Sequence, residues 1–309
     1  MKAIHYVDFG DSNVIQLSEI PQPEIRNSSD VLIQVKAASV NPLDMKIRMG
    51  YIQKVRPVAL PFCPGLDASG VVLAVGDEVK KFKIGDEVIA VTMANAYSEV
   101  VLVNELFVAP KPENLTFEEA TSLAVNLGTA QTLLFTEGKL EKGQRVFIQG
   151  AAGAVGATMV QLAKNSGLYV YATASGLGVD LVKGLGSDEV FDYKLQDATE
   201  IISAVDLVAD CAGGESQSKL FKILKTGGKL LSIAGMPSPE LAKEFNVDAR
   251  FISSNLTAAN LENGLTMVKN GKIKPIVSKV FKFEEAANAQ DYLSVGGVNG
   301  KVVLTFQSK

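Results

Sequence analysis

The chain has 309 residues, 47% of them hydrophobic and 21% charged, so it is long enough for about two globular domains with sizeable cores. Its 30 basic and 34 acidic residues give a formal charge of −4, and an acidic chain without basic runs is a poor candidate for binding nucleic acid. The two cysteines are too few for a disulfide framework, and together with the single histidine they are too few for a Cys/His metal site. The chain also lacks an apolar run long enough to span a membrane.

The N-terminal stretch MKAIHYVDFG lacks the apolar core of a signal peptide, and the small number of cysteines suits a reducing compartment. We therefore expect a cytoplasmic protein. The only histidine, His5, falls in the first predicted strand. A strand histidine that faces solvent or a polar neighbour is a simpler interpretation than the base of a serine nucleophile.

The first 110 residues alternate in the way that β-strands do. Val31, Ile33 and Val35 are apolar at a period of two, and residues 71–76 and 86–91 continue the pattern. Pro and Gly turn signals separate these stretches. This part of the sequence predicts a small all-β unit.

The pattern changes at Thr116, which begins a capping box with Glu119 and a mixed-apolar helical segment that continues to about residue 135. Strand and helix patterns then alternate, starting with a strand at 145–150 and a helix at 151–167, which predicts a doubly wound parallel sheet. After about residue 270 short strands return, interrupted by a helix at 284–293. We expect this tail to join the β unit.

The glycine-rich stretch from Gly150 to Gly156 is the strongest functional motif, because it follows a predicted strand and opens a predicted helix. Gly153 lets the backbone approach a pyrophosphate, Gly156 lets helix and strand pack closely, and the helix N-terminus offers N–H groups to phosphate. Ala151 stands where the common pattern has glycine. A turn that merely packs a helix on a sheet is the alternative interpretation.

The end of the second strand of this unit indicates which nucleotide binds. NAD sites usually carry a carboxylate there, whereas this chain has Ser175, which accommodates a 2′-phosphate without repelling it. Tyr193 and Lys194, after the third strand, are candidates to complete the phosphate site. The pattern favours NADPH, although Ser175 also suits a helix cap.

The whole chain resembles the zinc-free quinone oxidoreductases, the zeta-crystallin-like branch of the medium-chain dehydrogenase/reductase superfamily. The stretches that carry the resemblance span nearly the whole chain in the family's order: Asn41-Pro42-Leu43-Asp44 with Lys46, Arg48 and Gly50; Pro64–Gly70; Leu127–Ala130; AAGAVG with Gln161–Lys164; Ala172–Ser175; Leu185–Asp188; Asp192-Tyr193; and Gly300–Val303.

The resemblance implies an α/β Rossmann doubly wound parallel sheet plus a GroES-like β-barrel domain. The GroES-like catalytic domain would comprise 1–120 and 270–309, and the NADP(H)-binding domain 121–269, with the cofactor in the cleft between them. Zinc-bearing relatives have a cysteine ligand at the Asn41 position and a histidine near Leu66, so no metal is expected.

The resemblance also implies which residues contact NADPH: Asn41 and Thr129 at the nicotinamide, Gly153, Ala154 and Val155 at the pyrophosphate, Ser175 and Tyr193 at the adenosine phosphate, and Cys211, Ala212, Ile233 and Ala234 along the cleft. Many relatives have a lysine where this chain has Leu177, which weakens the expected NADPH preference.

Lys46 and Tyr51 are the catalytic candidates. Lys46 is suited to stabilising negative charge on a carbonyl oxygen. Tyr51 and Tyr97 are each suited to donating a proton or to lining the substrate pocket. For both tyrosines, packing with the hydroxyl at the surface is the simpler interpretation. For Asp44 and Asp67, local or inter-strand hydrogen bonds are simpler than acid catalysis.

These observations predict an NADPH-dependent, zinc-independent reductase of quinones or α,β-unsaturated carbonyls, forming a homodimer. An enoyl-thioester reductase is the close alternative. A noncatalytic NADPH-binding or redox-sensing protein is the alternative from a different class, because fold resemblance alone does not establish activity.

Overall fold

The computed structural model describes residues 1–254 and 256–306, which form two compact units. The first unit contains residues 1–125, 256–262 and the described chain from residue 275 onwards. The second unit contains residues 126–254 and 263–274. The domain limits proposed at residues 120 and 270 stay a prediction.

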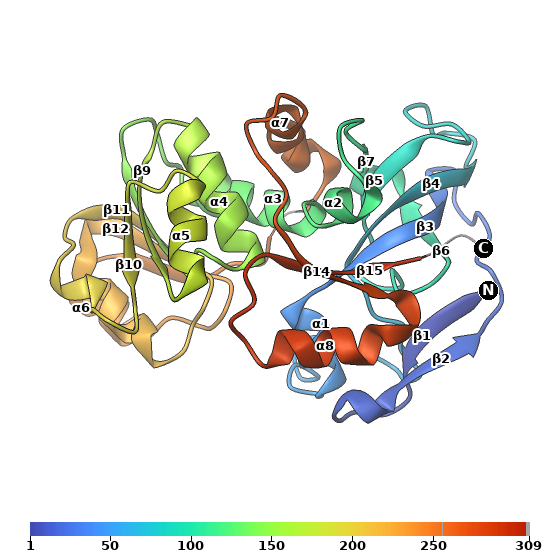
Figure 1. Cartoon of the computed structure of the whole chain (residues 1–309), viewed down its shortest axis with the longest axis horizontal. Coiled ribbons are helices and arrows are strands. Elements are labelled where there is room, and N and C mark those ends of the chain that lie inside the picture. The colour runs from blue at the N-terminus through green and yellow to red at the C-terminus, as the bar shows by residue number, and fades with distance from the viewer. Residues whose placement is uncertain (255, 307–309) are drawn as a thin grey trace. The chain divides into compact units, whose positions relative to one another are not determined.

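The first unit is built on a seven-stranded sheet with the order β14-β15-β3-β4-β5-β7, in which β6 also pairs with β3 (Figure 1). Its strands are β3 (Asp30–Val40), β4 (Asp67–Val75), β5 (Glu87–Val91), β6 (Val100–Asn104), β7 (Val108–Pro110), β14 (Val277–Lys282) and β15 (Lys301–Thr305). A separate antiparallel pair consists of β1 (Lys2–Tyr6) and β2 (Ile15–Glu19). As predicted, the apolar residues Val31, Ile33 and Val35 lie in the core.

Three helices flank this sheet. Helix α1 (Pro42–Arg48) begins directly after β3, because Pro42 at its first position is favourable there and breaks the strand. Helix α2 (Phe117–Thr121) begins at the predicted capping box, in which the Glu119 amide donates to Thr116 Oγ1 at 3.2 Å and the Thr116 amide to Glu119 Oε2 at 2.9 Å. Helix α8 (Ala286–Ser294) matches the predicted C-terminal helix.

The second unit is built on a six-stranded, wholly parallel sheet, as predicted, with the order β10-β9-β8-β11-β12-β13 (Figure 1). Its strands are β8 (Arg145–Gln149), β9 (Tyr169–Ala174), β10 (Glu189–Asp192), β11 (Val205–Asp210), β12 (Leu224–Ser232) and β13 (Asp248–Phe251). The remaining helices are α3 (Ala124–Gln131), α4 (Ala154–Asn165), α5 (Leu177–Gly184), α6 (Pro239–Glu244) and α7 (Ala258–Lys269).

The central strand β8 has a continuous buried run from Val146 to Ile148, because a parallel strand in such a sheet is covered on both faces. From β8 the chain proceeds first to β9 and β10 on one side, and then crosses to β11 on the other. The strand order therefore reverses between β8 and β11. In open α/β sheets the crevice at the carboxyl ends of such a pair of strands is the usual ligand site.

The mixed-apolar segment predicted as one helix to about residue 135 is divided. It forms α2, then α3, and then a π-helical turn over Thr132–Thr136. In that turn Thr132 Oγ1 donates to Gly128 O at 2.7 Å, and the amide of Glu137 donates to Thr132 O at 2.9 Å. The wider turn follows from these two bonds, which apolar periodicity alone does not reveal.

Candidate functional site

The glycine-rich turn connects β8 to α4 in the second unit. Gly150 has φ +76°, a conformation that favours glycine, and a Cβ on Gly156 would lie 2.3 Å from Gly150 O. The first helical hydrogen bond runs from the Ala157 amide to Gly153 O at 2.8 Å, so the preceding amides of α4 have no partner within the helix. Amides of this kind at a helix N-terminus are available to bind an anion.

Ala151 fits this turn without strain, although the common pattern has glycine there. Its side chain is fully buried, and it is absent from the residues with positive φ. The amide of Ala151 donates to Thr173 O at 3.0 Å, which fixes the turn to the end of β9. The departure from the pattern is therefore compatible with the same backbone geometry.

Ser175 and Tyr193, the residues predicted at the adenosine phosphate, lie together. Ser175 Oγ donates to the Tyr193 hydroxyl at 2.9 Å. Asp192, at the end of β10, accepts from the amides of Gly176 at 3.4 Å and Lys194 at 2.9 Å. The sequence places Asp192 directly before Tyr193, but does not reveal that its carboxylate bonds to the backbone at the ends of both β9 and β10.

Asp210 organises the loops that follow β11 and β12. Its fully buried carboxylate accepts from the amides of Ala212 at 3.1 Å and Gly213 at 2.7 Å, from Gln217 Nε2 at 2.8 Å and from Ser232 Oγ at 2.8 Å. Asp210 was not among the predicted site residues, although a polar residue at the end of a buried parallel strand is a usable signal.

The four predicted cleft residues, Cys211, Ala212, Ile233 and Ala234, lie on these loops. The pKa of the Cys211 thiol is raised by desolvation and by the neighbouring Asp210 carboxylate. A thiol with a raised pKa is a weak nucleophile at neutral pH. Thr129, the remaining predicted residue of the second unit, is buried on α3.

In the first unit Asn41 belongs to a buried polar network. Lys301 Nζ donates to Asn41 Oδ1 at 2.5 Å, and Asn41 Nδ2 donates to Asp67 Oδ1 at 2.9 Å. Burial raises the pKa of Asp67, and the Lys301 ammonium opposes that shift. Burial lowers the pKa of Lys301, opposed by the two nearby carboxylates. Asn41 was a predicted site residue, whereas Lys301 was not.

Asp44 forms the second half of this network. Its carboxylate accepts from the amides of Asn41 at 2.9 Å and Gly65 at 3.2 Å and from the Tyr97 hydroxyl at 3.3 Å. Burial raises the pKa of Asp44 to about 7, against the stabilising backbone hydrogen bonds. Asp44 and Asp67 thus form the local and inter-strand hydrogen bonds expected of them. The surface placement expected for the Tyr97 hydroxyl is wrong, because Tyr97 is fully buried.

The two catalytic candidates lie on α1 and the turn that follows it. Lys46 is half-buried, and Tyr51 is 72% exposed. His5 Nδ1 lies 2.8 Å from Ser18 Oγ on the β1–β2 pair, as expected of a strand histidine with a polar neighbour.

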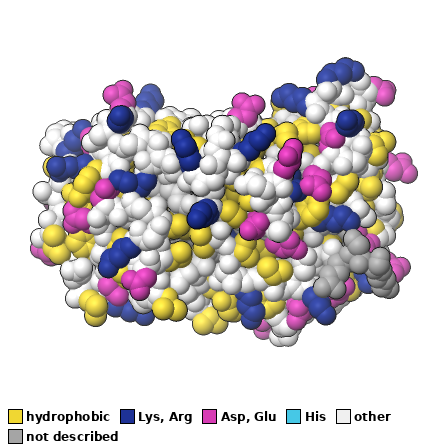
Figure 2. All heavy atoms as spheres, turned by 45° about the horizontal axis from the view of Figure 1, so that its top comes forward, with side chains coloured by type: hydrophobic (Ala, Val, Ile, Leu, Met, Phe, Trp, Pro, Cys, Tyr) yellow, Lys and Arg dark blue, Asp and Glu magenta, His cyan; other side chains and the backbone are white. Residues whose placement is uncertain are grey.

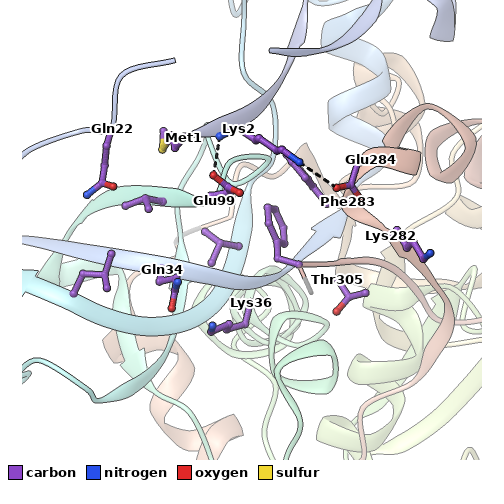
Figure 3. Close-up of a pocket in the computed structure, with 14 residues that line it drawn as sticks. Met1, Lys2, Gln22, Gln34, Lys36, Glu99, Lys282, Phe283, Glu284 and Thr305 are labelled. Atoms are coloured by element: carbon purple, nitrogen blue, oxygen red, sulfur yellow. Dashed lines mark hydrogen bonds and ion pairs between the residues drawn. The ribbon is translucent and has the colours of Figure 1, made fainter. Parts of the chain in front are cut away.

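A groove of about 840 Å³ on the first unit contains none of the predicted site residues (Figure 3). In it the Lys2 amide donates to Glu99 Oε2 at 2.7 Å, and Lys2 Nζ lies 4.0 Å from Glu284 Oε1. The rings of Phe283 and Phe306 stack with their centroids 4.3 Å apart. These contacts satisfy one another and do not indicate a ligand.

Among residues 1–254 and 256–306, no three His, Cys, Asp or Glu side chains are grouped so as to hold a metal ion. At the two positions where the family resemblance would place zinc ligands, this chain has Asn41 and Leu66. These residues do not suit zinc, because leucine offers no donor atom and the Lys301 ammonium bonds to Asn41. No described helix has the length and apolar character required to cross a bilayer. On the face in Figure 2, basic side chains are scattered among acidic ones.

Comparison with known proteins places these features in a family. The alcohol dehydrogenase GroES-like domain model matches residues 27–113, and the zinc-binding dehydrogenase model matches 185–304. An NADPH-dependent alkenal/one oxidoreductase of Arabidopsis thaliana is 35% identical over 98% of this chain and 79% of the relative. A quinone oxidoreductase of Mus musculus is 32% identical over 98% and 97%. The structure of the quinone oxidoreductase from Coxiella burnetii aligns with a TM-score of 0.91, 32% identity and 99% coverage of both chains.

The chain belongs to the quinone oxidoreductase branch of the medium-chain dehydrogenase/reductase superfamily. The predicted fold class, a Rossmann sheet plus a GroES-like domain, is confirmed, and this quinone oxidoreductase homologue is an oxidoreductase. The superfamily consists of pyridine-nucleotide dehydrogenases that act on small molecules. The roles predicted for individual residues stay predictions.

Proposed function

We propose that this quinone oxidoreductase homologue reduces quinones or α,β-unsaturated carbonyls with NADPH and without zinc. The observation that carries the proposal is the turn from Gly150 to Gly156, where Gly156 has no room for a side chain and the first amides of α4 are free of helical partners. The names of the mouse and Arabidopsis relatives support the substrate classes.

NADPH is the proposed cofactor because the ends of β9 and β10 present neutral hydroxyls. Ser175 and Tyr193 form a pair in which the Ser175 hydroxyl donates to Tyr193, so the Tyr193 hydroxyl is left to donate to a phosphate oxygen, and neither neutral group repels it. The Asp192 carboxylate in this region is already bonded to two backbone amides. The backbone around Gly153, Ala154 and Val155 is proposed to hold the pyrophosphate.

When bound, the nicotinamide supplies a hydride, which gives an enone a new C–H bond at its β-carbon or converts a quinone to the hydroquinone anion, and in both cases negative charge is left on an oxygen of the substrate. In our proposal Lys46 stabilises that charge from α1, and Tyr51 or water supplies the proton that completes the reduction. Asn41 and Thr129 would orient the nicotinamide. The loops with Cys211, Ala212, Ile233 and Ala234 would line the cofactor site.

We further propose a homodimer formed at an edge of the six-stranded sheet, because no described strand pairs with the outer side of either β10 or β13. A cytoplasmic location is proposed because Cys63 and Cys211 are both free thiols.

The test is a titration of the metal-free protein with NADPH and NADH, followed by 1,2-naphthoquinone, 9,10-phenanthrenequinone and a short enone while cofactor absorbance is recorded. Turnover with NADPH that a chelator leaves unchanged is the expected result. Turnover only with an enoyl thioester would identify the alternative reductase. Tight NADPH binding without turnover would favour a binding protein, and the lack of any nucleotide binding would reject the proposal.

A further inference from the structure

The Asn41 side-chain amide lies between a buried cation and a buried anion. Its oxygen accepts from Lys301 Nζ at 2.5 Å, and its nitrogen donates to Asp67 Oδ1 at 2.9 Å. Asn41 is 4%, Lys301 3% and Asp67 0% exposed. Inside the first unit, two hydrogen bonds thus connect three polar side chains in series, with a cation at one end and an anion at the other.

Strand register brings these residues together. Strand β15 pairs with β3 so that Val302 faces Val40, which places Lys301 beside Asn41 at the end of β3. Strand β4 pairs with the other side of β3 so that Ala68 faces Ala38, which places Asp67 beside the same end. The arrangement is therefore set by the central sheet of the unit and not by a surface loop.

The two charges determine the orientation of the amide. A flipped Asn41 would put its NH₂ group against the Lys301 ammonium and its oxygen against the Asp67 carboxylate, and both contacts would be repulsive in an interior of low dielectric. Nδ2 also donates to Ser39 O at 3.4 Å, so both amide hydrogens have acceptors. The remaining hydrogen-bonding capacity is a lone pair of Oδ1, which accepts only from a donor.

We propose that Lys301 and Asp67 are positioning residues that hold the Asn41 oxygen as an acceptor for the carboxamide N–H of the nicotinamide. The inference rests on the proposed function, in which Asn41 lies at the nicotinamide. It assigns roles to two residues that do not themselves touch the cofactor. It also predicts which chemical group of the cofactor the network recognises.

Binding of three ligands distinguishes positioning of the Asn41 oxygen from a merely structural role of Lys301. They are NADPH, its reduced 3-acetylpyridine analogue, in which an acetyl group without N–H replaces the carboxamide, and 2′,5′-ADP, which lacks the nicotinamide. Dissociation constants are measured for the wild type, K301M, K301R and the control K282M, which makes the same change at an exposed lysine of the neighbouring strand β14.

The wild type is expected to bind NADPH more tightly than the acetylpyridine analogue. K301M should weaken NADPH binding roughly tenfold, as expected for loss of a hydrogen bond oriented by a charge, and should abolish the preference over the analogue. Binding of 2′,5′-ADP should change less than about twofold in K301M. K301R should retain the preference, and K282M should match the wild type.

Equal weakening of NADPH and 2′,5′-ADP by K301M, or an unchanged preference for NADPH over the analogue, would overturn the inference while leaving the proposed function intact. Failure of the wild type to bind NADPH or to reduce any substrate would instead reject the proposed function. If K301M does not fold because Asp67 is left as an unpaired buried charge, the double variant D67N/K301M removes both charges and is measured in the same way. It too should lose the preference.

Discussion

The hydroxyl of Ser175 donates to the hydroxyl of Tyr193 at 2.9 Å, which joins the ends of the adjacent parallel strands β9 and β10. Both side chains are neutral, and Tyr193 is 59% exposed. The region that is proposed to receive a 2′-phosphate therefore offers hydrogen-bond donors but no positive side chain in this pair. Affinity for NADPH should accordingly be open to improvement by a single added cation.

Leu177→Lys is expected to tighten NADPH binding about fivefold to tenfold, because Leu177 is 83% exposed at the start of α5 and a lysine there adds a phosphate contact in a solvent-screened setting. NADH affinity should stay unchanged. Fluorescence titration with both cofactors measures the effect, and Leu177→Gln is the uncharged control. An equal gain for NADH would show that the 2′-phosphate lies elsewhere.

Gly156→Ala and Gly153→Ala should separate folding of the phosphate turn from its function. A Cβ on Gly156 would lie 2.3 Å from Gly150 O, whereas one on Gly153 would lie 3.4 Å from the same atom. G156A is therefore expected to lose about 1–3 kcal/mol of stability together with cofactor affinity. G153A should unfold like the wild type but bind NADPH more weakly, because its methyl group occupies the space for the pyrophosphate. Thermal unfolding and NADPH titration are measured for both variants. A G156A variant with wild-type stability and activity would contradict the close approach of residue 156 to Gly150 O.

Asp44 makes stability depend on pH. Its pKa is about 7 in the folded chain against a usual value of 3.8, so between these values the folded state holds a proton that the unfolded state has lost. The contribution of Asp44 to stability therefore falls as pH rises through this window, by up to about 1.4 kcal/mol per pH unit, and levels off above it.

The measurement compares denaturant unfolding of the wild type and Asp44→Asn at several pH values between 4 and 8. The difference between the two should carry the Asp44 titration, because other groups are shared. The infrared band of a protonated carboxyl group should disappear from the wild type as pH rises through about 7, and should be missing from the variant. A pH-independent difference would mean that Asp44 stays in one protonation state.

Asp210→Asn should destabilise the protein by about 3 kcal/mol and weaken NADPH binding at least tenfold, because one amide oxygen cannot replace a carboxylate that accepts four hydrogen bonds. Asp206→Asn is the matched control on the same strand. Asp206 accepts from the Arg145 amide at 2.8 Å and pairs with Lys225, near the amino-terminal end of β11. Asp206→Asn should lose some stability and retain its affinity for NADPH. An equal loss of affinity in both variants would contradict the role of Asp210 in organising the loops after β11 and β12.

The parallel sheet of the second unit was predictable from the sequence, because its inner strands β8, β9 and β11 are short, mainly apolar runs bounded by glycine or polar residues. The β8–α4 connection was predictable for the same reason, since the glycine motif has meaning only between a strand and a helix. Thr116 and Glu119 likewise identify the start of α2 through local chemistry. Such features depend on residues that are close in the sequence.

The partners of Asn41 were not predictable, because they depend on register. Lys301 lies 260 positions from Asn41, and only the pairing of β15 with β3 brings the two together. The same holds for Tyr97, whose hydroxyl reaches Asp44 across 53 positions and is buried. A polar residue at the end of a buried strand indicates a network, but the sequence does not say which strand supplies its partner.

The position of β15 between β14 and β3 affects the order in which the two sheets can be completed during translation. All six strands of the second unit's sheet lie between Arg145 and Phe251, so they emerge from the ribosome before β15 does. Residues 37–40 of β3 pair with β15 and thus keep an open hydrogen-bonding edge until late in translation. During translation, this edge of β3 must therefore be protected from pairing with strands of other molecules, even after all strands of the six-stranded sheet have been synthesised.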